Sequence, residues 1–323
     1  MIGEFSRRRM LAFGTSALAL APSLARANTG SLIPTPPPEL VDGFTDMTDR
    51  LLLETTINGK GPYRFVVDTG ADVSVVAADV AAELGLLPRN DVVVQGIVRS
   101  VPAQTVHLPS LAFGKIELEN VAAPVLPRKW LGADGYLGLD VLDGRRVTFD
   151  FQNSKLTVDR AVTPNGWSHF NDVVVRVDGS NGRLKAVDCT VDDVEAIAFI
   201  DSGAQLSICN TRLYSELKSR GTFAIEGGDI PLMGATGGLM MGKLVEVSKI
   251  RLGDVLFSKT RLAISDLNVF NVWGLANKPA LFIGMDFLQQ SSMFSIDYRH
   301  KELRFKLTDY ITQKSAPDRF ARA

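Results

Sequence analysis

One short motif decides how this sequence is interpreted, and it occurs twice: FVVDTGA at residues 65–71 and AFIDSGA at residues 198–204. Each copy is an apolar run followed by Asp, a small hydroxyl residue, Gly and Ala. A single Asp-Gly pair can serve a turn between two strands without any chemistry. Two copies in one chain need an explanation that covers both, and they indicate an internal repeat.

The repeat extends beyond the motif itself. When Asp68 is placed on Asp201, residues 56–84 align with residues 189–217 without a gap. Two further matches follow in the same order, an apolar run with Gly-x-Asp and then a hairpin. They read YLGLDVL (136–142) and VTFDFQNSKLTV (147–158) in the first copy, and FIGMDFL (282–288) and FSIDYRHKELRF (294–305) in the second.

The conserved order of elements divides the chain into two lobes. We assign the N-terminal lobe to residues 48–165 and the C-terminal lobe to residues 166–307. The apolar runs before the two Asp residues do not alternate with polar residues, so both faces of these strands should be covered. A short helix should follow, ending at Gly85 in the first copy and running from Asn210 to Gly221 in the second.

Two strands that each end in Asp-small-Gly can meet about a pseudo-twofold axis. The carboxyl groups of Asp68 and Asp201 would then lie close together. Two carboxylates in contact cannot both ionise cheaply, so they share a proton, and one acts as a base while the other acts as an acid. A water molecule between them can lose a proton to the base and attack a carbonyl carbon. The motif therefore predicts metal-free hydrolysis of an amide.

The other motif residues support the carboxyl groups in the same interpretation. The Thr69 and Ser202 hydroxyls can bond to the opposite loop, and the Gly70 and Gly203 amides can favour the charged carboxylates. A Ser or Thr after the glycine could lower the carboxyl pKa further, but Ala occupies both positions. We therefore expect optimal activity at mildly acidic rather than strongly acidic pH. The two alanines are Ala71 and Ala204.

A glycine-containing β segment lies between the two motifs of each copy. An apolar hairpin with a mobile tip can close over a bound molecule, so these segments are candidate substrate-binding flaps. The first segment contains far fewer glycines than the second. The candidate residues are Gly96 and Ile97 in the first flap, and Gly234, Gly237, Gly238 and Met240 in the second.

With these motifs, the chain resembles an aspartic peptidase of the retropepsin-like group that carries both lobes on one chain, as pepsin-like enzymes do. The resemblance covers nearly everything after residue 47 and implies a closed, mostly β, bilobal fold built from two repeats with short helices. It also implies endopeptidase activity on a peptide or protein substrate through Asp68 and Asp201. Two departures are Ser202 in place of Thr and a first flap that is poor in glycine and has no Tyr.

The sequence leaves alternative interpretations open. A non-catalytic peptide-binding or assembly module could retain the same fold, although a binder does not need both Asp residues. Asp140 and Asp286 are expected to begin short helices rather than to act in catalysis. Asp150 and Asp297 are expected to be polar strand or hairpin residues.

No metal or cofactor is expected. The three histidines are scattered without the spacing of a zinc site, and no complete phosphate-binding loop is present. Cys189 and Cys209 could pair in an oxidising compartment or remain buried thiols. A formal charge of −1 with 22% charged residues gives no indication of a nucleic-acid surface.

The two ends of the chain are expected to lie outside the fold. Residues 1–27 match a twin-arginine signal peptide, with Arg7 to Arg9, a short apolar run and a small-residue cleavage site. Residues 28–47 read as a proline-rich linker or pro-segment, and residues 308–323 as a polar tail. These features predict a bacterial-type periplasmic or secreted protein, monomeric and without a stable membrane span after signal removal.

Overall fold

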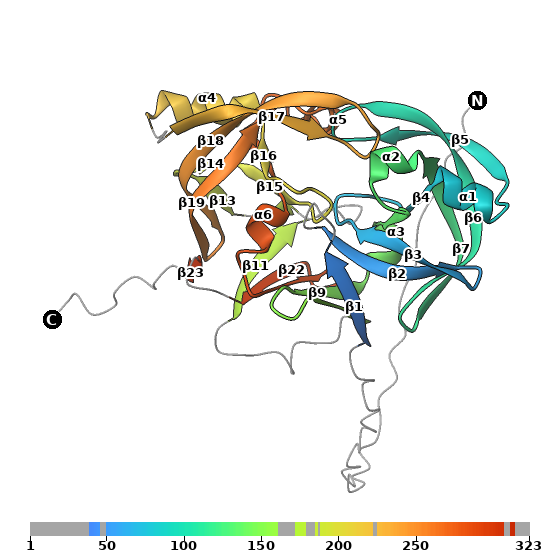
Figure 1. Ribbon diagram of the computed structural model, residues 1–323. Helices are drawn as coiled ribbons and strands as arrows, with labels where there is room; N and C mark the ends of the chain where they lie inside the picture. Colours follow the sequence, from blue (N-terminus) through green and yellow to red (C-terminus); the bar gives the residue numbers. More distant parts are fainter. Residues whose placement is uncertain are drawn as a thin grey trace, which may run out of the picture. The chain divides into compact units, whose positions relative to one another are not determined.

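The computed structural model describes residues 39–45, 50–160, 172–178, 185–186, 188–221, 225–306 and 311–313. These residues belong to one compact unit that spans residues 38–323. The unit is mostly β with a few short helices, which confirms the predicted fold class (Figure 1). The predicted signal peptide, and the predicted linker up to residue 38, lie outside the described residues.

Six strands of the first repeat close into a barrel. Hydrogen bonding passes from β2 to β3, β8, β4, β7 and β6 and returns to β2, so none of the six is left as a free edge. A seventh strand, β5, extends β6 into a long hairpin. The strands are β2 (Leu51–Ile57), β3 (Lys60–Val67), β4 (Val75–Ala77), β5 (Pro88–Gln95), β6 (Ser100–Phe113), β7 (Ile116–Leu126) and β8 (Gly135–Leu137).

The second repeat has the same succession of pairings. They run from β15 to β20, β16, β19, β18, β13 and β14, and β14 continues into β15 after one residue. Strand β17 extends β18 into a hairpin, as β5 does for β6. The strands are β13 (Cys189–Val191), β14 (Val194–Glu195), β15 (Ile197–Ile200), β16 (Ile208–Cys209), β17 (Ile225–Met233), β18 (Leu239–Leu252), β19 (Val255–Ile264) and β20 (Ala280–Ile283).

A central sheet joins the two repeats. Its order is β1, β10, β9, β21, β22 and β11, and its middle pair, β9 and β21, comes from equivalent hairpins of the two copies. Thr148 pairs with Ser295, its counterpart in the repeat, so the pseudo-twofold axis passes through this pair. The strands are β1 (Glu39–Thr45), β9 (Arg145–Asp150), β10 (Lys155–Arg160), β11 (Asp172–Asp178), β21 (Met293–Asp297) and β22 (Glu302–Lys306).

The central sheet is held by aromatic packing and one buried ion pair. The Phe294 ring lies 5.9 Å from that of Phe149 and 4.9 Å from that of Phe305. Arg146 and Asp297 face each other across β9 and β21, and the Arg146 Nη2 to Asp297 Oδ2 distance is 2.6 Å. Both side chains are buried, so this pair ties the two repeats together in a region that excludes water.

Strand β1 lies in a stretch that the sequence assigned to the linker, and β23 (Ile311–Gln313) lies in the predicted polar tail. Residues 39–42 pair with β10 and residues 43–45 pair with β2, while β23 pairs with β19. Each added strand pairs with backbone groups that its partner strands leave unpaired beyond their other pairings. This benefit depends on distant partners and leaves no local pattern in the sequence.

The helices are short, and their ends follow local signals. The Asn210 side chain accepts a hydrogen bond from the Leu213 amide at 2.9 Å and caps α4, and Gly221 with φ +67° follows its end. No helix in the described ranges has the length and hydropathy that a membrane span requires. The helices are α1 (Ala78–Glu83), α2 (Arg128–Leu131), α3 (Leu139–Leu142), α4 (Thr211–Ser219), α5 (Asn268–Val272) and α6 (Met285–Leu288).

Candidate active site

Asp68 and Asp201 occupy equivalent places at the ends of two buried strands. Asp68 follows β3, which pairs in parallel with β8, and its amide donates to the Leu137 carbonyl at 3.0 Å. Asp201 follows β15, which pairs in parallel with β20, and its amide donates to the Ile283 carbonyl at 2.9 Å. Each acidic residue is therefore positioned by the apolar strand that precedes it in the motif.

The two loops face each other so closely that each carboxyl group lies against the glycine of the other loop. A Cβ atom on Gly70 would be 2.8 Å from Cγ of Asp201, and one on Gly203 would be 2.6 Å from Oδ1 of Asp68. Only glycine leaves room for this approach. Each carboxyl group is close enough to affect the pKa of the other, and we call the two groups the carboxyl pair.

The hydroxyl residues of the two loops lock the carboxyl pair in place. The Thr69 amide donates to Ser202 Oγ at 3.1 Å, and the Ser202 amide donates to Thr69 Oγ1 at 2.9 Å. The same hydroxyls donate onward to backbone carbonyls of the opposite repeat, at 3.2 Å to Ile200 and 2.8 Å to Val67. Ser202 therefore makes the same two bonds as Thr69, and its missing methyl group does not alter the pattern.

Backbone amides also reach the carboxylates. The Gly70 amide donates to Asp68 Oδ1 at 2.8 Å, whereas Asp201 Oδ1 accepts from the amides of Gly203 and Ala204 at 3.0 and 3.1 Å. In both repeats the alanine amide also donates to the backbone carbonyl of the Asp, Ala71 to Asp68 at 3.4 Å and Ala204 to Asp201 at 3.3 Å. Neither alanine can offer a hydroxyl.

The carboxyl pair is more basic than ordinary aspartic acid. Burial raises the pKa of both groups, and the Asp68 charge raises the pKa of Asp201 further. Hydrogen bonds from the amides oppose these effects, and the Arg50 guanidinium also lowers the pKa of Asp68. The pair therefore keeps one proton at a pH where two isolated aspartic acids would both have lost theirs.

Sequence reasoning missed an arginine and a tyrosine beside the carboxyl pair. Arg50 Nη1 donates to the Tyr136 hydroxyl at 2.6 Å and to the Leu131 carbonyl at 3.0 Å. Burial raises the pKa of Tyr136, so this hydroxyl stays protonated. The sequence did contain a sign of the tyrosine: in the aligned Gly-x-Asp motifs, the first repeat has Tyr136 where the second repeat has Phe282.

The second acidic motif supports the loops. Asp140 Oδ1 accepts from the amide and the hydroxyl of Ser74 at 2.9 and 2.7 Å. Asp286 accepts from the amide and the hydroxyl of Ser207 at 3.1 and 2.7 Å. Both Asp residues lie in the first turn of a short helix, α3 or α6, as expected for a structural role.

The two flap candidates meet at their tips. We call the β5–β6 hairpin the first flap and the β17–β18 hairpin the second flap. Thr236 Oγ1 donates to the Arg99 carbonyl at 2.7 Å, and Arg99 Nε donates to the Thr236 carbonyl at 3.1 Å. A side chain on Gly96 would collide with Thr236, and a Cβ on Gly234 would be 3.2 Å from Ile97. These candidate residues therefore belong to the contact between the flaps.

Each flap also rests on a helix of the other repeat. Gly237 of the second flap packs on the Trp130 ring of α2, and the Arg99 guanidinium lies 5.1 Å from the same ring. The Asn268 side chain of α5 donates to Ser100 of the first flap at 3.2 Å. The remaining candidates are Gly238, whose Cβ would lie 3.2 Å from Val98, and Met240, whose sulfur accepts from the Ser265 hydroxyl at 2.8 Å.

Nothing in the described part of the chain suggests a metal centre. No group of three or more His, Cys, Asp or Glu side chains there could hold a metal ion. Cys189 and Cys209 are separate buried thiols, and burial raises the pKa of each to about 12. They are therefore protonated and unreactive at neutral pH.

A mostly β fold built from two repeats, each contributing one Asp to a shared carboxyl pair, defines the aspartic protease class. The sequence matches the aspartyl protease family over residues 53–141 and 187–287, more than half of the chain. The protein therefore belongs to the aspartyl protease family. No curated protein matched the sequence significantly.

Proposed function

We propose that this protein is an aspartic endopeptidase that hydrolyses peptide bonds with a water molecule activated between Asp68 and Asp201. The observation that carries the proposal is the packing of each carboxyl group against the glycine of the opposite loop, which brings two buried acids together. Neither a turn residue nor a simple binding site needs two buried acids in contact.

The chemistry follows from the unequal proton affinities of the pair. Asp68, the more acidic member, takes a proton from water as the water oxygen attacks the carbonyl carbon. Asp201 gives its proton to the carbonyl oxygen, which produces a neutral tetrahedral diol. Asp68 then returns its proton to the amide nitrogen, the C–N bond breaks, and Asp201 recovers a proton from a diol hydroxyl. The products are a carboxylic acid and an amine, and the pair regains its starting state.

We further propose that the enzyme is of the retropepsin-like type, with both lobes on one chain and an extended peptide enclosed by both flaps. The flap contact at Thr236 and Arg99 supports this type, because each repeat contributes one hairpin. Backbone pairing with the flaps would hold the peptide. The flaps must separate for a protein substrate to enter.

Two complete lobes on one chain support a protein that acts as a monomer. The N-terminal sequence supports export by the twin-arginine route and a periplasmic or secreted location. This part of the proposal rests on Arg7 to Arg9, the apolar run and the small residues before Asn28. Replacing Arg7 and Arg8 with Lys should retain the unprocessed precursor in the cytoplasm. Fractionation and N-terminal sequencing would measure this, and unchanged processing would contradict it.

The decisive experiment for the activity compares peptide cleavage by the wild-type protein with cleavage by Asp68→Asn and Asp201→Asn. Each variant should lose at least about a thousandfold in kcat, since the base or the acid is removed. Asp254→Asn, in the exposed turn between β18 and β19, is the matched control and should retain full activity. Undiminished cleavage by either dyad variant would reject the mechanism.

The rival function is a peptide-binding or assembly module without catalysis. It predicts that no peptide in a random pool is cleaved and that Asp68→Asn binds peptides as the wild type does. A statine-type transition-state mimic separates the two functions, since a catalyst should bind it more tightly than a substrate peptide of the same sequence.

A further inference from the structure

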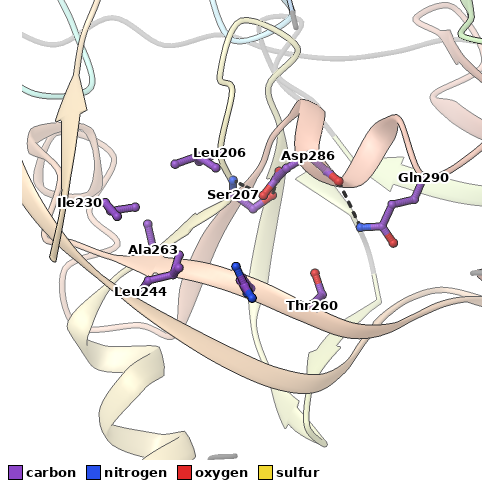
Figure 2. Close-up of a pocket in the computed structure, with 9 residues that line it drawn as sticks. Leu206, Ser207, Ile230, Leu244, Thr260, Ala263, Asp286 and Gln290 are labelled. Carbon is purple, nitrogen blue, oxygen red and sulfur yellow. Dashed lines mark hydrogen bonds between the residues drawn. The ribbon is translucent and has the colours of Figure 1, made fainter. Parts of the chain in front are cut away.

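A pocket of about 400 Å³ opens beside the Asp201 loop in the second repeat. Leu206, five residues after Asp201, forms one wall, and Ile230 of the second flap forms another (Figure 2). The floor is Leu244 and Ala263, which pair across β18 and β19. The pocket therefore lies between the loop and the flap that would hold a peptide on this side.

The polar groups of the pocket differ in whether they are already satisfied. The carboxylate of Asp286 already has hydrogen-bond partners, because both of its oxygens accept hydrogen bonds from Ser207. Thr260 is only 5% exposed, and no hydrogen bond of its hydroxyl is found within the described ranges. Figure 2 shows the Thr260 oxygen directed toward the side of the pocket formed by Asp286 and Gln290. Because Thr260 lines the pocket, its hydroxyl can bond to a ligand there.

Arg261 supplies the only cationic side chain among the residues that line the pocket. It is exposed, and it has no ion pair within the described part of the chain. Its cross-strand neighbour is Glu246, the carboxylate that shares its face of the sheet. An arginine beside apolar walls suits a carboxylate on an apolar stem, because it can donate two parallel hydrogen bonds.

The first repeat does not contain this combination. Val76 and Cys209 are equivalent in the two repeats, and they pair with Val125 and Ile264, so those two residues are also equivalent. Arg261 lies three residues before Ile264, and the residue three before Val125 is Ala122. The aligned Gly-x-Asp motifs place Gly144 where the second repeat has Gln290. The cation therefore lies on one side of the carboxyl pair and has no counterpart at the aligned position, so it can select one particular residue of a bound chain.

We propose that this pocket selects an acidic side chain of the peptide substrate, with the carboxylate bound by Arg261 and Thr260 and the stem packed against Leu206 and Ile230. The proposal rests on the proposed peptidase function. Side chains of an extended peptide follow one another at about 3.3 Å per residue, so a pocket beyond the Asp loop receives a residue that is separated from the scissile bond. The preference should appear at one position on one side of that bond.

The test is cleavage of a random octapeptide pool by the wild type, Arg261→Met and Arg261→Glu. The wild type should favour Glu over Gln about tenfold at one position away from the scissile bond. Arg261→Met should abolish this ratio, and Arg261→Glu should favour Lys there. Arg212→Met, an exposed arginine on α4, is the matched control and should keep the wild-type ratio. No Glu preference in the wild type, or an unchanged preference in Arg261→Met, overturns the proposal.

A binding measurement separates failure of the pocket from failure of the peptidase function. Asp201→Asn, with and without Arg261→Met, is applied to an array of the same peptides. Glu-selective binding that Arg261→Met removes would support the pocket even if the wild type cleaves nothing. Binding that does not distinguish Glu from Gln, including no binding of either, overturns the pocket even if cleavage is efficient.

Discussion

The two flaps occupy equivalent places in the two repeats but present different surfaces. On the outer face of the first flap, Gln95 and Ser100 pair across the hairpin. The equivalent pair on the second flap is Met233 and Leu239, with exposed fractions of 68% and 64%. The outer faces of the two hairpins therefore differ in polarity, although the hairpins meet at their tips.

The Asp loops, by contrast, have hardly diverged. Thr69 and Ser202 make the same exchange of hydrogen bonds, and both glycines leave the same space. A shared proton requires matched geometry from both copies, whereas a flap surface or a side pocket acts alone. The two repeats therefore remain alike at the Asp loops, where both must act on one proton. They differ at the flap surfaces and the pocket, where each repeat makes its own contacts.

The largest effect should come from separating the halves at the central sheet. Arg146→Met leaves Asp297 buried without its arginine, and we expect a loss of about 3–5 kcal/mol in the free energy of unfolding. Urea denaturation measures this. Arg89→Met, at an exposed arginine of β5, is the control and should change stability by less than about 0.5 kcal/mol.

The stability lost in Arg146→Met should depend on pH. Burial raises the pKa of Asp297, but hydrogen bonds from His300 and Arg146 outweigh burial and hold it below its usual value. A lowered pKa contributes stability above the unfolded pKa, and this contribution is lost as pH falls through the folded pKa. The difference between wild type and Arg146→Met should narrow only in strong acid. An equal difference at all pH values would contradict the ion-pair explanation.

The next effect tests the symmetry of the Asp loops directly. Thr69→Ala and Ser202→Ala each leave one amide and one carbonyl of the opposite loop without a partner. Each should cost about 1–3 kcal/mol of stability, and the two costs should be similar. Thermal unfolding of the two variants checks this. A large cost for one and none for the other would show that a single repeat supports the pair.

A smaller effect should distinguish the surroundings of the two acids. Arg50→Met removes the cation that lowers the Asp68 pKa, so that pKa should rise, and the acid limb of the pH–kcat profile should move to higher pH. Tyr136→Phe is the matched control, because it makes the position like Phe282 and leaves Arg50 charged. Tyr136→Phe should move the acid limb of the pH–kcat profile less than Arg50→Met does. A shift to lower pH in Arg50→Met would contradict the assignment.

The smallest effect concerns the contact between the flaps. Thr236→Val removes the donor to the Arg99 carbonyl without changing side-chain size, and should weaken the contact by about 0.5–1.5 kcal/mol. Hydrogen exchange at residues 96–100 and 234–238 should become faster. Thr190→Val, on β13, should leave these rates unchanged. If the Thr236 variant exchanges at the wild-type rate, the hydrogen bond does not hold the flaps together.

The repeat, the mostly β fold class and the two acidic motifs could be predicted from the sequence alone. This was possible because these features depend on local chemistry: an unalternating apolar run predicts a covered strand, and Asn210 and Gly221 mark the ends of a helix. The duplication also predicted a contact between distant residues, because it indicated that Asp68 and Asp201 lie together.

The other contacts between groups far apart in the sequence could not be predicted and became known from the folded structure. The Arg50 side chain beside Tyr136, the buried Arg146–Asp297 pair and the meeting of the flaps at Thr236 join residues 86, 151 and 137 positions apart. Strand β1 likewise depends on edges supplied by β2 and β10. Such contacts arise from the closure of two barrels and their common sheet, and their free energy depends on burial and partners that no local pattern encodes.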